Sequence, residues 1–264
     1  MYKNPGLNNA VLRFALCVIG LVTTVAASVS QAGEVRVAVA ANFTAPMVQI
    51  AADFEKSTGH TSVLSYGATG RFYAQISNGA PFDVLLSADA ATPARLVQEG
   101  KAVRASNFTY AQGRLALWSA QPGVVDAQGD VLRRGQFRYL AIASPLLAPY
   151  GAAAIQTMEQ MGLRAAIEPK LVTGESVGQA FNMAATGNAE LGFVAASQVF
   201  EGGKLKSGSV WLVPANMHTP IKQDAVLLLR GTANPAAVAL LAYLKTEKTK
   251  AVITSFGYEV PVAQ

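Results

Sequence analysis

Cysteine is almost absent from the sequence, because Cys17 is the only one among 264 residues. It lies in an N-terminal segment that we expect to be removed, so the mature chain has no cysteine. Disulfides, thiolate catalysis and metal sites built from cysteine are therefore excluded. Histidine is scarce too, since only His60 and His218 occur, far apart in the chain. We expect each of them to be a surface or capping residue.

Charge is also sparse, since Asp, Glu, Lys and Arg make up only 14% of the residues. No basic run is interleaved with aromatic residues, so the sequence predicts no nucleic-acid surface. Hydrophobic residues reach 51%, which is enough for a sizeable core and is not typical of a disordered chain. The length suits one large domain or two modest ones.

The N-terminus has the three parts of a secretory signal peptide. Lys3 and Arg13 are its only charges, an apolar run covers Phe14–Ala27, and Ser-Gln-Ala ending at Ala32 resembles a cleavage site. The alternative is a membrane anchor, but a spanning helix needs about 20 apolar residues. We expect residues 1–32 to be cleaved and the mature protein to be periplasmic. Removal leaves 19 basic against 16 acidic residues, so the sequence pI near 9.3 indicates no basic surface.

Strand-like and helix-like segments alternate along the rest of the chain, which is typical of α/β folds with parallel strands. The predicted strands are 35–41, 61–66, 83–88, 114–120, 139–143, 170–173, 190–195, 210–213 and 224–229. The predicted helices lie around 47–54 and 72–76 and at 91–99, 151–161, 176–186, 235–244 and 249–256. Residues 122–135 read as a connection between two blocks of similar size.

Two similar blocks predict a two-lobed α/β fold in which each lobe is a mostly parallel sheet flanked by helices. Residues 33–113 and 222–264 form the expected lobe I, and residues 114–221 form lobe II. The chain is expected to cross between the lobes near 114–118 and 220–225, where two crossing strands would act as a hinge. A secreted chain built in this way suggests a protein that binds a solute in a cleft.

Four predicted strand-to-helix turns carry small, polar or glycine-rich residues, at the sheet edge where α/β proteins bind ligands. They contain Asn42, Thr69, Tyr150 and the stretch Thr173–Gly178. Their donors are neutral: amides, hydroxyls and the free N–H groups of helix starts. Taken one at a time, Asn42, Thr69 and Tyr150 can be explained without a ligand, as a turn residue, a helix cap and a packing residue. Together the turns suit a small, desolvated oxyanion held by hydrogen bonds.

The fourth turn also matches G-x-S-x-G, the nucleophile motif of α/β-hydrolases, with Ser176 at its centre. The flanking strand and helix fit that motif. The remaining triad fits poorly, because His218 is the only later histidine and the acids between are Glu190 and Glu201. We therefore expect Ser176 to cap a helix and the turn to expose N–H groups.

The chain resembles the type II periplasmic binding protein family, and within it the molybdate-binding receptors of molybdate ABC transporters. The resemblance covers essentially the whole mature chain. The segments that carry it are VAVAANFTAPM (37–47), GATGRFYAQISNGAPFDVLLSAD (67–89), SPLLAPYG (144–151), TGESVGQAFNMAATGNAELGFVAASQV (173–199), PIKQDAVLL (220–228) and TKAVITSFGYEV (249–260).

The resemblance implies that Asn42, Thr69, Tyr150 and Val177 bind the oxyanion, Val177 through its backbone. Ala41 and Ser176 are additional candidates. Thr69 replaces a serine but keeps the hydroxyl. Some relatives have a tyrosine where this chain has Ala195, and Tyr150 is a candidate replacement for that donor. Glu175, the one carboxylate close to the site, is expected to point away.

The expected function is a periplasmic receptor that captures molybdate, and also tungstate, and delivers it to the membrane permease of an ABC transporter. The resemblance implies no enzymatic activity, no cofactor and no metal other than the bound anion, and a monomer. A receptor for another oxyanion or small solute, a serine hydrolase and a sensor that has lost anion binding stay open as alternatives.

Overall fold

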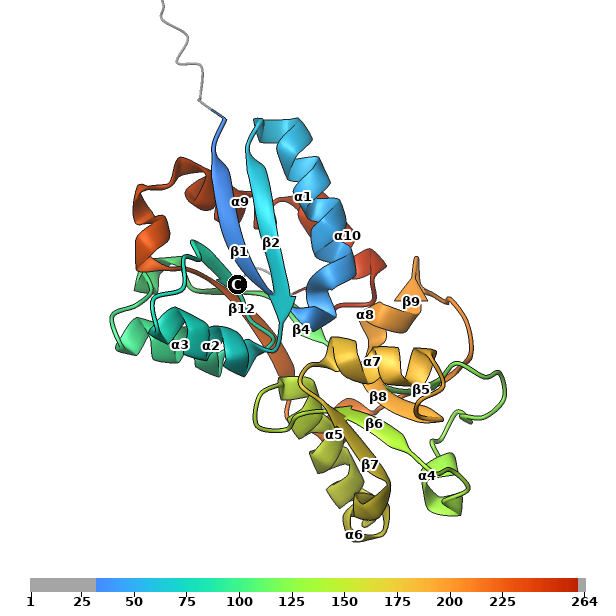
Figure 1. Ribbon diagram of the computed structural model, residues 1–264. Helices are drawn as coiled ribbons and strands as arrows, with labels where there is room; N and C mark the ends of the chain where they lie inside the picture. The colour runs from blue at the N-terminus through green and yellow to red at the C-terminus, as the bar shows by residue number, and fades with distance from the viewer. Residues whose placement is uncertain (1–31, 261–264) are drawn as a thin grey trace, which may run out of the picture. The chain divides into compact units, whose positions relative to one another are not determined.

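Two five-stranded sheets organise residues 32–260, the part that the structure, a computed structural model, describes (Figure 1). Apart from Ala32, the expected signal peptide lies outside the described residues. The first sheet has the order β2-β1-β3-β12-β4. Its strands are β1 (Glu34–Ala40), β2 (Thr61–Gly67), β3 (Val84–Leu86), β4 (Phe108–Gly113) and β12 (Ile221–Leu227). The second sheet has the order β11-β5-β8-β6-β7. Its strands are β5 (Leu115–Ser119), β6 (Leu140–Ala143), β7 (Leu171–Gly174), β8 (Leu191–Ala195) and β11 (Ser209–Leu212).

One strand in each sheet runs against the other four. In the first sheet β1 is parallel to β2 and β3, whereas β12 is antiparallel to both β3 and β4. In the second sheet β6 is parallel to β7 and β8, whereas β5 is antiparallel to β8 and β11. Each sheet is therefore mixed, with four strands in one direction, which confirms the predicted two-lobed α/β fold.

Helices cover both faces of the first sheet because its strands are apolar on both sides. Val37 and Leu86 pack into the core on one face, and their neighbours Ala38 and Leu85 pack into the core on the other. The first face is covered by α1 (Thr44–Thr58), α9 (Pro235–Leu244) and α10 (Glu247–Ser255). The second face is covered by α2 (Thr69–Ser77) and α3 (Ala91–Gln98). Alternating burial on a pleated strand thus fixes where each helix lies.

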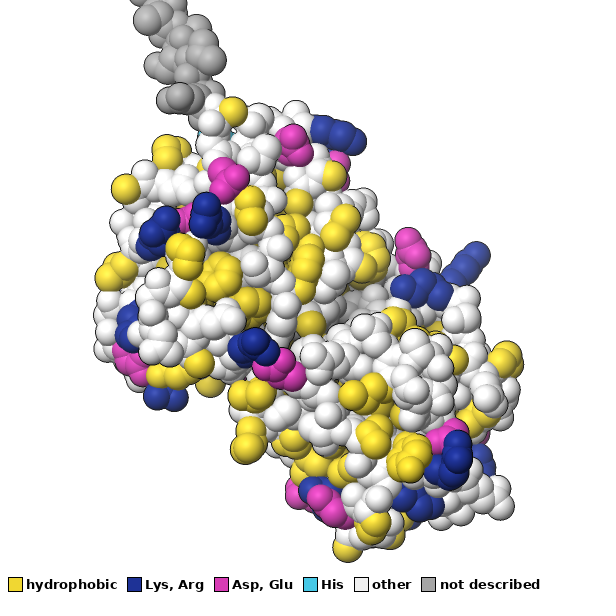
Figure 2. Space-filling view, in the orientation of Figure 1, with side chains coloured by type: hydrophobic (Ala, Val, Ile, Leu, Met, Phe, Trp, Pro, Cys, Tyr) yellow, Lys and Arg dark blue, Asp and Glu magenta, His cyan; other side chains and the backbone are white. Residues whose placement is uncertain are grey.

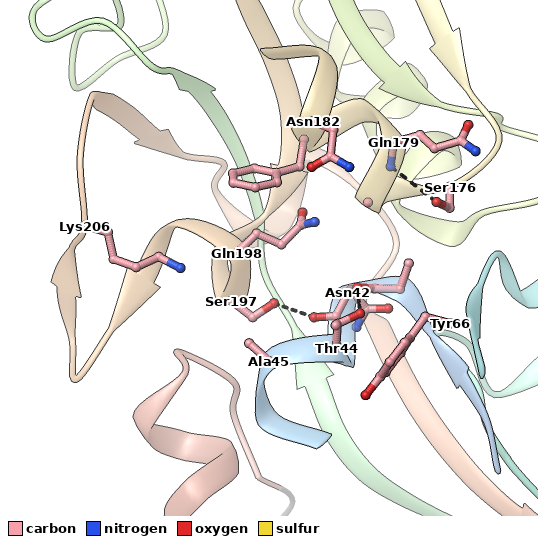
Figure 3. Close-up of a pocket in the computed structure, with 13 residues that line it drawn as sticks. Asn42, Thr44, Ala45, Tyr66, Ser176, Gln179, Asn182, Ser197, Gln198 and Lys206 are labelled. Carbon is pink, nitrogen blue, oxygen red and sulfur yellow. Dashed lines mark hydrogen bonds between the residues drawn. The ribbon is translucent and has the colours of Figure 1, made fainter. Parts of the chain in front are cut away.

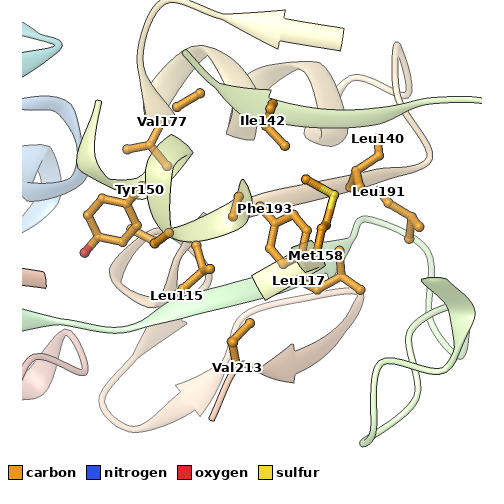
Figure 4. Packing of buried hydrophobic residues seen from close by; sticks show 14 of the residues in the cluster. Leu115, Leu117, Leu140, Ile142, Tyr150, Met158, Val177, Leu191, Phe193 and Val213 are labelled. Carbon is orange, nitrogen blue, oxygen red and sulfur yellow. The ribbon is translucent and has the colours of Figure 1, made fainter. Parts of the chain in front are cut away.

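The second sheet repeats this plan. Leu117 and Phe193 pack against Met158 of α5 (Pro149–Gln160), within the cluster drawn in Figure 4. On the opposite face Ala116 and Val194 share a cluster with α7 (Val177–Ala185) and α8 (Ala196–Val199). The remaining short helices are α4 (Val131–Arg134) and α6 (Arg164–Ile167). Both faces are again buried, as expected for strands without polar alternation.

The chain crosses between the sheets at two places. β4 ends at Gly113 and β5 begins at Leu115, so only Arg114 separates the sheets there. The second crossing is the segment 213–220 between β11 and β12, earlier than the predicted 220–225, because β12 already belongs to the first sheet from Ile221 on. A side chain on Gly113 would place its Cβ 2.1 Å from the Tyr150 hydroxyl and 2.7 Å from Gln223 Nε2. Glycine therefore allows the crossing strand to lie directly against these two groups.

Several elements were not predicted from the sequence. β4 was missed, as were α4, α6, α8 and the two-stranded hairpin of β9 (Phe200–Glu201) and β10 (Lys204–Leu205). β4 is an edge strand of partly exposed residues, so it lacks the continuous apolar run of the central strands. The other elements are two to four residues long, too short to show a period.

No helix among residues 32–260 is both long and apolar enough to cross a membrane. On the face of the molecule shown in Figure 2, basic and acidic side chains are interspersed and often lie side by side. Ion pairs among the described residues include Arg95 of α3 with Glu99, just past the end of that helix, and Lys248 with Asp53. The charged surface visible there thus mixes both signs.

Candidate functional site

Four turns that join a strand to a helix line one small pocket. Two follow the neighbouring strands β1 and β2, and two follow the neighbouring strands β6 and β7. The space between them is small: the centre of a water-sized sphere can occupy about 10 Å³ of it, close to the least that one water needs. All six residues that the sequence proposed for a site line it: Ala41, Asn42, Thr69, Tyr150, Ser176 and Val177. The structure thus brings these separated positions together around one small space.

Free backbone N–H groups are the main donors at this pocket. Within the described residues, no acceptor is present for the N–H groups of Asn42, Thr69, Tyr150 and Val177. Each of these residues stands in the first turn of a helix, where the N–H groups have no partner inside the helix. The same helix ends carry a partial positive charge. The pocket is therefore suited to an anion without needing a charged side chain.

The Thr69 hydroxyl is buried, and its oxygen accepts a hydrogen bond while its proton stays available. Its Oγ1 accepts a hydrogen bond from the N–H of Ala88 at 3.0 Å, and the side chain is 2% exposed. A hydroxyl can accept and donate at the same time. No acceptor for its proton is present in the described part of the chain. Thr69 can therefore donate to a bound solute while Ala88 holds its oxygen in place.

The Asn42 side chain faces other protein groups. Its Nδ2 donates to Gln223 Oε1 at 2.7 Å and to the Tyr258 hydroxyl at 2.9 Å. A side-chain amide has only two N–H donors, so both are occupied. The donor that Asn42 keeps for the pocket is its backbone N–H. Its side chain fixes the turn that the short 3-10 helix η1 (Ala41–Phe43) makes before α1.

Tyr150 likewise uses its side chain within the protein and keeps its backbone N–H for the pocket. Its hydroxyl lies 3.4 Å from Gln223 Nε2, which donates to it, and interacts with Tyr258. Figure 4 shows that the hydroxyl points away from the labelled apolar side chains of the core cluster. The Tyr150 N–H follows Pro149, whose ring nitrogen has no hydrogen, at the start of α5. The backbone N–H of Tyr150 is thus free, while its hydroxyl belongs to a buried polar network.

Ser176 caps α7, as the sequence predicted. Its Oγ accepts from the N–H of Gln179 at 3.3 Å, a side-chain cap of the helix that begins at Val177 (Figure 3). This bond orients the first turn, so that the Val177 N–H stays free at the pocket. Ala41 contributes only a methyl side chain to the lining. Ala195 lies elsewhere, and its N–H donates to Gln198 Oε1.

The buried network behind the pocket was missed from the sequence. The Tyr258 hydroxyl contacts the Asn42 carbonyl oxygen at 2.7 Å and Ser197 Oγ at 3.0 Å. Ser197 belongs to α8 beside the second sheet, whereas Asn42 follows β1 of the first sheet. The hydrogen bond from Ser197 to Asn42 therefore joins the two lobes. The members of the network are Asn42, Tyr110, Tyr150, Ser197, Gln223 and Tyr258, and each is at most 4% exposed. No local motif marks these positions, because they meet only through the fold.

Burial keeps the phenols of this network protonated. Desolvation raises the pKa of Tyr258 to about 12, even though several hydrogen bonds act in the other direction. Desolvation also raises the pKa values of Tyr110 and Tyr150 well above 10.0, helped by their neighbouring tyrosines. Protonated phenols are neutral donors at physiological pH. The network therefore adds no negative charge behind the pocket.

Two charged residues flank the pocket without lining it. Arg71 follows Thr69 on α2, and Glu175 precedes Ser176 in the turn before α7. Arg71 Nη1 donates to both carboxylate oxygens of Glu175, and this hydrogen bond raises the pKa of the guanidinium. The carboxylate is thereby paired with a cation, which limits its repulsion of an anion in the pocket.

A larger, more open groove adjoins the pocket (Figure 3). It has a volume of about 490 Å³ and shares Ala41, Asn42 and Ser176 with the small pocket. Its wall mixes apolar groups with amide side chains and with Lys206, whose ammonium group points towards the groove. The small pocket thus adjoins a larger groove and shares part of its lining. Among residues 32–260, no three His, Cys, Asp or Glu side chains cluster in a way that could hold a metal ion.

Known proteins resemble this chain over almost its full length. The family described as bacterial extracellular solute-binding protein matches residues 35–259. The molybdate-binding protein ModA of Azotobacter vinelandii is 56% identical over 241 residues, which are 91% of this chain and 96% of that protein. ModA of Rhodobacter capsulatus is 54% identical over 227 residues, 86% of this chain and 88% of that protein.

A solved structure shares the fold as well. The periplasmic molybdate-binding protein of Azotobacter vinelandii superposes with a TM-score of 0.83 at 43% identity. The match covers 86% of this chain and all of that one. The two chains thus share the same overall fold.

Proposed function

Because the chain belongs to the bacterial extracellular solute-binding protein family, we propose that it is a periplasmic receptor that captures molybdate, and also tungstate, between its lobes. Its relatives that are more than half identical are named as molybdate-binding proteins. The closed receptor then presents the anion to the permease of an ABC transporter. Capture and delivery require no reaction and no cofactor.

The observation that carries this proposal is the set of free N–H groups at four helix starts, joined by the Thr69 hydroxyl. The N–H groups can only donate, and the Thr69 hydroxyl, whose oxygen already accepts from the Ala88 N–H, offers its proton. A fully ionised tetrahedral anion needs donors only, whereas hydrogen phosphate also needs an acceptor for its proton. The site therefore favours a dianion without a proton. Sulfate is smaller and would leave the donors at longer distances.

Lobe closure completes the site in this proposal. Residues 33–113 and 221–264 form lobe I, residues 114–212 form lobe II, and the crossings at Arg114 and 213–220 act as the hinge. Each lobe contributes two helix starts, so neither lobe alone surrounds the anion. Closure excludes water, which strengthens each hydrogen bond to the ion. The receptor works as a monomer in the periplasm after cleavage of residues 1–32.

A direct test compares four anions by thermal shift and calorimetry. We expect molybdate and tungstate to raise the melting temperature and to bind one per chain, with sulfate and phosphate far weaker. Ligands that bind only the folded state stabilise it, so the shift follows affinity. If sulfate binds best, the receptor is one for another oxyanion. If none of the four binds, the proposal is wrong.

We also infer that Ser176 is not a catalytic nucleophile. Its Oγ caps α7, whereas the His60 ring accepts from the Gly33 N–H and the His218 ring bonds the Thr219 carbonyl oxygen. A general base must reach the nucleophile's proton. Turnover of ester substrates that disappears in Ser176→Ala would contradict this inference.

A further inference from the structure

One ion pair joins the two lobes beside the pocket. Arg71 belongs to α2 of the first lobe, and Glu175 lies between β7 and α7 of the second. Nη1 of the arginine bonds both carboxylate oxygens. The other ion pairs formed within residues 32–260 each join residues of a single lobe. Whether this ion pair forms therefore depends on the distance between the two lobes.

A second contact lies next to it. The N–H of Gly70 donates to the carbonyl oxygen of Leu147 at 2.9 Å, again from one lobe to the other. A Cβ at Gly70 would come within 3.1 Å of the Leu147 Cα, so the two segments touch closely. Thr69 lies immediately before Gly70 and lines the pocket. The start of α2 therefore contacts the anion pocket and the opposite lobe within three consecutive residues.

We propose that Arg71 and Glu175 set the affinity of the receptor from outside the pocket, as an ion pair that is made when the lobes close on the anion. The proposal rests on the proposed function, because it concerns closure around that same site. Any contact made only in the closed state adds to ligand affinity, since binding and closure are linked. Neither residue lines the pocket, so both act as positioning residues.

The pairing also balances charge near the anion. With both residues present, the rim of the pocket carries one positive and one negative group in contact. Loss of Arg71 leaves an unpaired carboxylate close to a bound dianion, which is unfavourable. Loss of Glu175 removes the same closure contact but leaves a cation nearby, which partly compensates. The effects of the two single substitutions on molybdate affinity should therefore differ, although both substitutions break the same ion pair.

The experiment is calorimetric titration of molybdate into the wild type and four variants: Arg71→Ala, Glu175→Ala, Arg71→Glu and the exchanged double variant R71E/E175R. Arg95→Ala is the matched control, because it breaks an Arg–Glu pair of similar exposure inside lobe I. The side-chain exposures are 62% and 29% for Arg95 and Glu99, against 53% and 33% for Arg71 and Glu175. Each protein is measured at about 0.01 M and about 1 M ionic strength, where the Debye lengths are about 30 Å and about 3 Å.

We expect Arg71→Ala to weaken binding roughly two- to fivefold at low salt, the range for a partly exposed ion pair. Glu175→Ala should weaken it less, Arg71→Glu more, and R71E/E175R should recover most of the loss. The differences should shrink at high salt, and Arg95→Ala should bind like the wild type. Equal affinity of Arg71→Ala and Arg95→Ala, or no recovery in R71E/E175R, would overturn the proposal.

Failure of the proposed function would look different, because the wild type itself would then bind no molybdate.

Discussion

Removal of the Thr69 hydroxyl is the sharpest single test of the pocket. Thr69→Ala deletes a buried donor whose proton has no acceptor within the described residues, and it also deletes the acceptor of the Ala88 N–H. The first loss acts only when an anion is bound. The second acts in both the free and the bound protein. The two effects can therefore be separated by measuring affinity and stability on the same variant.

The expected loss of binding free energy is roughly 1–3 kcal/mol, the usual cost of leaving a buried charged acceptor without one hydrogen bond. This corresponds to a dissociation constant about 5- to 150-fold higher. The melting temperature of the free protein should fall as well, because the Ala88 N–H loses its partner. Thr69→Ser keeps the hydroxyl and should stay close to the wild type in both measurements.

Calorimetric titration of molybdate gives the affinity, and thermal unfolding of the free protein gives the stability. Thr157→Ala is a suitable control, because its buried hydroxyl bonds the Ala153 carbonyl oxygen within α5. It should lower the melting temperature while leaving affinity nearly unchanged. If Thr69→Ala binds molybdate as tightly as Thr157→Ala does, the anion does not use the Thr69 hydroxyl and the reasoning is wrong.

Three further predictions follow from the network behind the pocket. Tyr150→Phe should change molybdate affinity by less than about threefold, since its backbone N–H is retained; a loss as large as that of Thr69→Ala would show that the hydroxyl binds the anion. Asn42→Ala and Tyr258→Phe should each weaken binding by roughly 1–3 kcal/mol by releasing the turn before α1, and unchanged calorimetric titrations of both would contradict this role. Because burial raises the pKa of Tyr258 to about 12, its proton is retained at lower pH and lost only above that value, so titrations between about pH 6 and pH 9 should give a constant affinity for a fully ionised anion.

Much of the architecture could be predicted because it is encoded locally. The apolar runs of β1, β3 and β8 and the glycine-rich turns after β2 and β7 mark strands and helix starts directly in the sequence. Ligands bind at the carboxyl ends of parallel strands, so the four turns could be proposed as one site before their contacts were known. The structure places all of them around one pocket.

The roles of individual donors were harder to predict. The sequence identifies Asn42 as a polar residue in a turn, but its side-chain amide is used by Gln223 and Tyr258, which are 181 and 216 residues away. Partners at that separation leave no spacing pattern in a single sequence. The same reason explains why the pairing of Arg71 with Glu175, 104 residues apart, was missed although both lie beside predicted site residues.

A crystal structure with bound molybdate, located by the anomalous scattering of molybdenum, tests the central claim most directly. The account predicts one molybdenum atom in the pocket, its oxygens accepting from the Thr69 hydroxyl and from the N–H groups of Tyr150 and Val177, with no lysine or arginine in contact. A molybdenum atom in the open groove beside Lys206, or one bonded by Arg71, would contradict it.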